Sequence, residues 1–138
     1  MVAKDTFHDN VKTALEKDGW TITHDPLYLR IELVQIYIDL GAEKIIAAEK
    51  GSKKIAVEVK SFLAPSTISE FHTALGQFIN YRCALAESEP ERILYLAVSL
   101  NAQTTFFQQR FIQTVIQSVS VKLLVFDPTN DSIVRWIN

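Results

Sequence analysis

Two charged side chains, Glu58 and Lys60, stand two residues apart in the apolar segment 55–60. Because successive side chains of a strand point to opposite faces, this carboxylate and this ammonium leave the same face. Asp39 lies near the end of an earlier segment rich in β-forming residues and can bring a second carboxylate into the same hairpin. Two carboxylates can hold a divalent cation, and a lysine beside them can stabilise charge on a phosphate. If they converge, these three residues predict metal-assisted hydrolysis of a phosphodiester bond.

The turn of this hairpin decides which acid lies beside Glu58. If residues 51–52 formed a two-residue turn, Glu58 would face Ile45 and Lys60 would face Glu43. Asp39 would then lie six residues beyond Ile45, about 20 Å along a straight strand. A longer loop, or a bend or bulge where a glycine follows Asp39, would bring the two acids together. We therefore predict Asp39 as the second acid and keep Glu43 as the alternative.

The composition indicates a globular chain with one domain. Its 138 residues suffice for one hydrophobic core, so we expect a single domain over residues 1–138. Hydrophobic residues make up 48% and charged residues 22%, which excludes a disordered chain. A single cysteine cannot form an internal disulfide, and no apolar stretch has the length of a signal peptide or membrane span. We expect a cytoplasmic protein.

The net charge of −2 argues against indiscriminate binding to nucleic acid. Five of the 14 basic residues nevertheless fall between positions 44 and 60. This cluster has two interpretations: its lysines protect strand edges on a solvated hairpin, or they form a local patch that attracts phosphate. For Glu58 and Lys60 the simpler alternative is an ion pair on an exposed strand face, worth about 0.2–1 kcal/mol.

The order of predicted elements favours an α/β (α+β) fold, in which helices flank one mixed sheet. Helices are expected over three segments with apolar residues at helical spacing: 5–18, 65–87 and 103–119. In the last of these, Phe107, Phe111, Val115 and Val119 form one apolar stripe. Strands are expected at 20–23, within 28–40, at 43–48, 53–60, 93–98 and 121–126, and at 132–137 on an edge.

This order resembles the core of PD-(D/E)xK nucleases, which runs helix, three strands, helix, strand. That core carries an aspartate on its second strand and Glu/Asp-x-Lys on its third, matched here by Asp39 and by Glu58-Val59-Lys60. Gln77 and Tyr81 on the following helix spell Q-x-x-x-Y, which is similar to an additional motif of the RecB-like branch, and i, i+4 spacing puts them on one helix face. The resemblance implies a restriction-endonuclease-like core with an added helix and strands at its C-terminal end.

Over nearly its full length the chain is also similar to the XisH family, the fdxN element excision controlling factors of cyanobacteria. Three segments carry this resemblance, at residues 4–8, 38–43 and 55–62. It implies a role in controlling site-specific DNA excision, with DNA and a small XisI-type protein as partners.

The nuclease resemblance implies a role for each matching residue. Mg²⁺ or Mn²⁺ would be held by Asp39, Glu58 and the carbonyl of Val59. Lys60 would position a metal-bound water or donate to the phosphate, and the Q-x-x-x-Y residues would orient the lysine or the DNA. Such nucleases sometimes add a residue from the first helix, for which Asp5, His8 and Asp9 stay open.

Two functions follow. The first is a divalent-metal-dependent DNA endonuclease that hydrolyses phosphodiester bonds during element excision. The alternative is a catalytically inactive accessory protein that keeps the nuclease fold and binds a XisI-type partner or a recombinase. The sequence does not decide between a monomer and a homo-oligomer, and no membrane partner is expected.

Overall fold

The computed structural model describes residues 4–47, 51–63 and 67–138. One sheet has the strand order β1-β4-β5-β6-β7-β8 and a separate two-stranded sheet pairs β2 with β3. The strands are β1 (Thr21–His24), β2 (Leu27–Ile31), β3 (Val34–Ile38), β4 (Leu40–Ala47), β5 (Gly51–Val59), β6 (Arg92–Ser99), β7 (Leu123–Asp127) and β8 (Ser132–Ile137). The helices are α1 (His8–Lys17), α2 (Thr67–Ser88), α3 (Leu100–Thr104), a 3₁₀ turn (Phe106–Gln108) and α4 (Arg110–Val119).

The large sheet is mixed. Antiparallel pairing joins β1, β4 and β5, parallel pairing joins β5, β6 and β7, and β8 returns antiparallel at the edge. The order of α1, three strands of this sheet, α2 and β6 confirms the predicted fold class, with the β2–β3 hairpin inserted between β1 and β4. No helix in the described ranges is long and apolar enough to cross a membrane.

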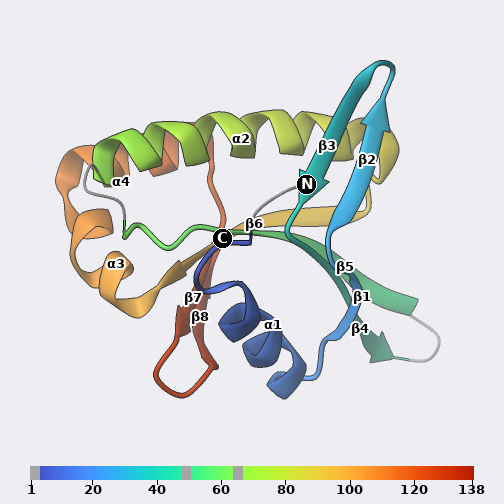
Figure 1. The fold of residues 1–138 in the computed structure, drawn as a ribbon, viewed down its shortest axis with the longest axis horizontal. Coiled ribbons are helices and arrows are strands. Elements are labelled where there is room, and N and C mark those ends of the chain that lie inside the picture. Colours follow the sequence, from blue (N-terminus) through green and yellow to red (C-terminus); the bar gives the residue numbers. More distant parts are fainter. Residues whose placement is uncertain (1–3, 48–50, 64–66) are drawn as a thin grey trace.

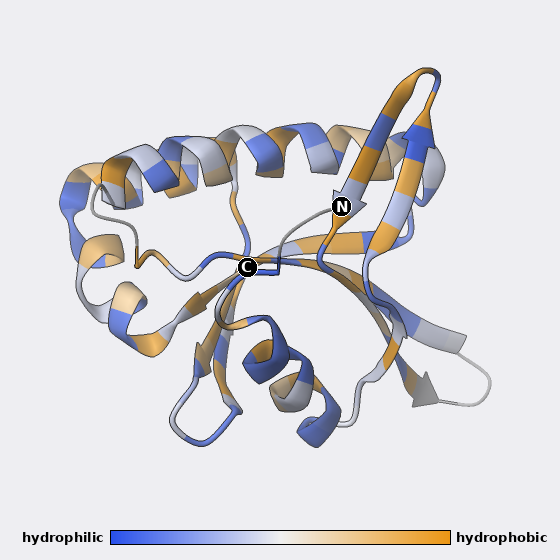
Figure 2. Ribbon diagram, viewed as in Figure 1, coloured by the Kyte–Doolittle hydropathy of each residue, from blue (hydrophilic) through white to orange (hydrophobic). Residues whose placement is uncertain are grey.

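Helices cover both faces of the sheet (Figure 1). On the α1 face, Val11 and Leu15 pack with alternate residues of β5, among them Ile55 and Val57. On the opposite face, α2 contributes Phe71, Ala74 and Phe78 to a core with Ala56, Leu94 and Leu96. Hydrophobic colour accordingly follows the central strand β6, which is covered on both sides (Figure 2).

The β2–β3 hairpin projects away from the sheet on the same side as α2 (Figure 1). Its inner residues Leu27, Leu29 and Ile38 are buried in the α2-side core, which fixes the hairpin against the helix. A single residue, Asp39, connects the end of β3 to the start of β4. The chain therefore passes from one sheet to the other at the residue predicted to carry chemistry.

The turn considered at residues 51–52 is not formed, because both residues belong to β5. Leu40 pairs with Val57 and Ala42 with Ile55, and a register shift follows between Ile45 and Ala47. The connection between the strands thus falls at residues 48–50, outside the described residues. Because the strands connect nearer to the N-terminus than in the two-residue alternative, and the shift between Ile45 and Ala47 adds one residue, the register moves by six residues and Asp39 arrives opposite Glu58.

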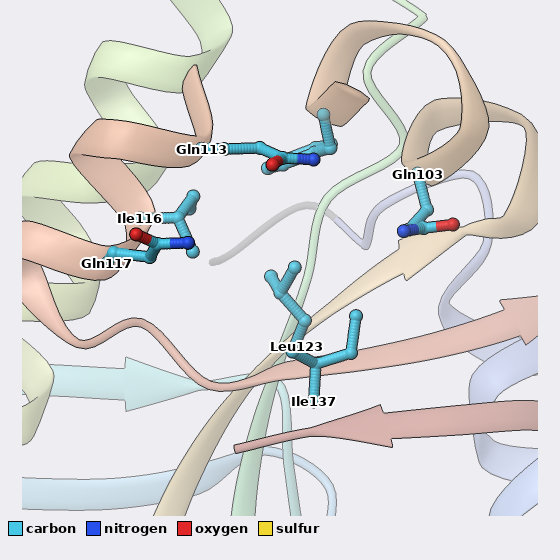
Figure 3. Close-up of a pocket in the computed structure, with 7 residues that line it drawn as sticks. Gln103, Gln113, Ile116, Gln117, Leu123 and Ile137 are labelled. Atoms are coloured by element: carbon cyan, nitrogen blue, oxygen red, sulfur yellow. The ribbon is translucent and has the colours of Figure 1, made fainter. Parts of the chain in front are cut away.

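The single helix expected over 103–119 is wrong. Ser99 caps α3 by accepting a hydrogen bond from the Ala102 amide, and the backbone of Thr105 (φ −117°, ψ −86°) ends that helix. Phe107 turns inward and is buried, whereas Phe111 on α4 is 69% exposed and leaves the predicted apolar stripe. The break opens a cavity of about 210 Å³ under α4 (Figure 3), lined by Gln103, Phe107, Gln113, Ile116, Gln117, Leu123 and Ile137.

Candidate active site

Asp39 and Glu58 lie side by side, and each carboxylate accepts a hydrogen bond from the backbone of the segment that carries the other. The backbone N–H of Asp39 donates to Glu58 Oε1 over 3.3 Å, and the N–H of Val59 donates to Asp39 Oδ2 over 2.8 Å. Glu43, the alternative acid, instead pairs with Lys54 across the strands and lies 3.8 Å from its Nζ. The structure therefore brings Asp39, and not Glu43, next to Glu58.

Lys60 completes the group at the end of β5. Its Nζ lies 3.6 Å from Glu58 Oε2, and its backbone N–H donates to the Ala97 carbonyl over 3.1 Å. The side chains of Glu58 and Lys60 are only 7% and 18% exposed. The alternative of an ion pair on a wet strand face is therefore wrong: this pair is largely desolvated, and the sequence could not show that α2 covers it.

The acids and the lysine border a cavity of about 270 Å³. Gln77 and Tyr81, one turn apart on α2, line the same cavity, so the structure brings the predicted site residues together. Tyr37 and Lys4 also line it and were not predicted. Tyr37 precedes Asp39 by two residues, a spacing that could have suggested it; the wall comprises Lys4, Asp5, Tyr37, Asp39, Glu58, Val59, Lys60, Gln77 and Tyr81.

The predicted lysine-rich segment contributes little to this cavity. Among its described members only Lys60 lines the wall. Lys44 Nζ donates to the Asp18 carbonyl over 2.7 Å and lies 5.7 Å from the centre of the Trp20 ring. Lys54 lies 3.8 Å from carboxylate oxygens of both Glu43 and Glu91. These two lysines support the β4–β5 end of the sheet rather than a phosphate patch beside the acids.

Burial and mutual repulsion shift the titration of the site. Burial, and then the neighbouring charge of Asp39, raises the pKa of Glu58 to about 8. Burial also raises the pKa of Asp39 above its ordinary value, against the stabilising hydrogen bond from Val59. For Tyr81, burial followed by the two carboxylate charges raises the pKa to about 12, so its hydroxyl keeps its proton at neutral pH. Two acids that resist ionising together are a setting in which a cation is strongly stabilising.

The donor set fits a hydrated Mg²⁺ or Mn²⁺ ion. Mg²⁺ is commonly bound by one or two carboxylates and keeps several waters, which the two acids and the Val59 carbonyl would allow. Gln77 Oε1 is buried without a hydrogen-bond donor, and a metal-bound water in this cavity would supply one. Within the described ranges, no group of three or more His, Cys, Asp or Glu side chains is placed to hold a metal, so Asp39 and Glu58 would be the two side-chain ligands.

Of the three residues considered as an additional site residue near the first helix, one lines the cavity. Asp5 lines the wall, but its two carboxylate oxygens accept the backbone N–H groups of Phe7 and Ser61, each over 2.9 Å. His8 is buried, with its Nε2 2.7 Å from Asp25 Oδ1, and it does not line the cavity. Asp9 is exposed and lies 3.8 Å from Lys4 Nζ. Asp5 thus joins the start of α1 to the chain just after Lys60.

Replacing Asp5 with asparagine is expected to lower the free energy of unfolding by about 1–3 kcal/mol, because one of two charge-assisted backbone hydrogen bonds is lost. The measurement is chemical denaturation, with Asp9→Asn as the matched control on the same segment. Affinity for Mn²⁺ at 25 °C should change little, since the Asp5 carboxylate oxygens are already engaged. Loss of metal affinity without loss of stability would contradict this structural role.

Comparison with known proteins extends the resemblance seen in the sequence. The profile of the XisH family, described as XisH protein, matches residues 1–134. The crystal structure of an XisH family protein from Nostoc punctiforme PCC 73102 is 53% identical, covers 97% of this chain and 100% of its own, and has a TM-score of 0.89. The crystal structure of an fdxN element excision controlling factor protein from Anabaena variabilis is 54% identical, covers 98% and 100%, and also has a TM-score of 0.89. No curated protein matches. Since the family profile spans nearly the whole sequence and two such structures share the fold end to end, this chain belongs to the XisH family.

Proposed function

We propose that this chain acts in DNA element excision as a divalent-metal-dependent endonuclease. The involvement in excision is carried over from the Anabaena variabilis relative, which is an fdxN element excision controlling factor protein. One observation carries the nuclease part: Asp39, Glu58 and Lys60 meet in a single cavity, where Glu58 is buried and Asp39 half-buried. DNA is the substrate on this proposal.

On this proposal each residue of the site has a separate role. Asp39, Glu58 and the Val59 carbonyl would hold Mg²⁺ or Mn²⁺, which lowers the pKa of a bound water and neutralises charge on the phosphate. Lys60 places its ammonium beside Glu58, from where it can donate to a phosphate oxygen or to the attacking water. Tyr81, with its high pKa, serves as a hydrogen-bond donor. Gln77 offers its buried oxygen as an acceptor for a water in the cavity.

Metal binding is the direct test. Crystals soaked in Mn²⁺ should show anomalous density between Asp39 and Glu58, with metal–oxygen distances of about 2.1–2.3 Å. Calorimetry in solution should give one site, weakened at least about tenfold in Asp39→Asn and unchanged in Glu43→Gln. No binding at millimolar Mn²⁺ in the wild-type protein would contradict the proposal.

The small number of carboxylates available to a metal favours a second candidate function. Two acids, one of them with a pKa of about 8, form a weaker metal site than a cluster of three would. A catalytically inactive member that binds a XisI-type protein or a recombinase would keep the same fold, and the exposed Phe111 on α4 offers an apolar contact for such a partner. Co-purification with a XisI-type protein that is lost in Phe111→Ala, together with no metal binding, would favour this candidate over the nuclease.

A further inference from the structure

The β2–β3 hairpin has two chemically different faces. Its inner face is aliphatic and packs into the α2-side core. In the antiparallel register Tyr28 lies opposite Tyr37, and Arg30 lies opposite Gln35. Because alternate residues of a strand share a face, these four side chains stand together on the outer face. All four are exposed, Tyr28 by 45% and Tyr37 by 38%.

The two tyrosines form an aromatic platform at the mouth of the candidate active site. Their ring centroids are 5.1 Å apart with an interplanar angle of 44°. Tyr37 also lines the cavity that holds Asp39 and Glu58. Toward the tip, Arg30 lies on the same face, and no carboxylate in the described part of the chain forms a salt bridge with it. An aromatic, cationic and amide surface thus runs from the free end of the hairpin to the acid pair.

We propose that this outer face binds single-stranded DNA, with bases stacked on Tyr28 and Tyr37 and the following phosphate directed into the cavity. The inference deepens the proposed nuclease function and depends on it for the fate of that phosphate. Aromatic side chains that stack bases, with a guanidinium beside them, are what single-strand binding surfaces use. Bases in a duplex are stacked on one another, so only unpaired, unstacked bases can stack on the rings of Tyr28 and Tyr37.

The charges of the chain favour a single strand over a duplex. Duplex binding without base contacts depends on many phosphate contacts, and this chain carries a net charge of −2. Among the described residues, the basic side chains on the hairpin face and the cavity wall are Lys4, Arg30 and Lys60. Three phosphate contacts on a single strand predict a slope of about −2 for log affinity against log salt. The remaining affinity would come from stacking, which salt screens little.

The test is fluorescence anisotropy with a labelled oligodeoxynucleotide of about 12 nucleotides, within the range of single-strand sites. The assay contains EDTA, so that binding is measured without cleavage. Tyr37→Ala and Tyr28→Ala should each weaken binding about tenfold, since stacking contributes about 1–3 kcal/mol per base. Tyr37→Phe keeps the ring and should bind within about twofold of wild type. Phe111→Ala removes an exposed aromatic ring elsewhere and should have no effect.

The outcomes separate this inference from the nuclease proposal. Normal single-strand binding by both alanine variants, or equal affinity for the same sequence as a duplex, would overturn the inference even if the wild-type protein cleaves DNA. Loss of binding in the alanine variants with retention in Tyr37→Phe would support it, even if no cleavage is found with Mg²⁺ or Mn²⁺. Circular dichroism of each variant confirms that the hairpin substitutions leave the chain folded.

Discussion

Replacing Glu58 with glutamine is expected to lower the rate of Mn²⁺-dependent DNA cleavage by about 10³-fold while the chain stays folded. Glutamine keeps the size of the side chain and an oxygen that can accept the 3.3 Å hydrogen bond from the Asp39 amide. It removes the negative charge that a divalent cation needs and the partner that holds Lys60 Nζ at 3.6 Å. The measurement is the rate of nicking of a supercoiled plasmid with metal in excess.

Glu43→Gln is the matched control for this prediction. Glu43 is also a strand carboxylate beside a lysine, at 3.8 Å from Lys54 Nζ, but it lies outside the cavity. Its removal should leave the cleavage rate within about twofold, as expected for a surface substitution. Full activity of Glu58→Gln, or a large loss in Glu43→Gln, would show that the acid pair is not the reactive centre. A wild-type protein without any cleavage would instead favour the accessory function.

The sequence was informative where a local pattern decides the geometry. Alternation along β5 is enough to put Glu58 and Lys60 on one face, because the period of a strand is fixed. Spacing by four residues likewise puts Gln77 and Tyr81 on one face of α2. Asp39 was a different case, since its position depends on a hairpin register that the 48–50 connection sets. A longer loop, or a bend or bulge near Gly41, was expected to bring the acids together. The β4–β5 pairing is regular from Leu40 to Ile45, so the position of the connection brings them together and no bulge at Gly41 is involved.

What the sequence could not show depends on contacts between distant segments. Burial of the Glu58–Lys60 pair results from the packing of α2 across the sheet, which no strand pattern contains. The break before α4 was hidden because Phe107 and Phe111 fit one helical stripe, although the chain buries the first and exposes the second. The role of Asp5 as an acceptor for the Ser61 amide joins residues 56 positions apart. Tyr37 could have been predicted as a site residue from the sequence, because it precedes Asp39 by two residues.

Without metal, the stability of the wild-type protein is expected to fall as the pH rises from about 4.5 to about 8. The pKa of Glu58 is about 8 in the folded chain, against an ordinary value of 4.5. The folded chain therefore holds this proton more tightly than the unfolded chain does. That contribution to the free energy of unfolding is fully present below pH 4.5 and is lost as the pH passes through 8. Its size is on the order of a few kcal/mol, because one pKa unit corresponds to about 1.4 kcal/mol.

Glu58→Gln isolates this effect from other titrating groups. The variant has no proton to lose at this position, so its stability should exceed that of the wild-type protein by a margin that grows between pH 6 and pH 9. Thermal unfolding in EDTA at both pH values measures that margin. A margin that is constant with pH would show that Glu58 titrates normally.

At high pH, bound metal should make the wild-type protein more stable than Glu58→Gln, the reverse of the order expected without metal. A cation binds the ionised acid pair, so Mn²⁺ must displace the Glu58 proton below pH 8 and meets no such competition above it. Wild-type affinity for Mn²⁺ is therefore expected to rise with pH, with release of close to one proton per ion at pH 7. Calorimetry in buffers of different ionisation enthalpy counts that proton. At pH 9 saturating Mn²⁺ should raise the unfolding temperature of the wild-type protein and leave that of Glu58→Gln nearly unchanged. Equal stabilisation of both proteins would place the metal away from Glu58, and with it the chemistry proposed for this cavity.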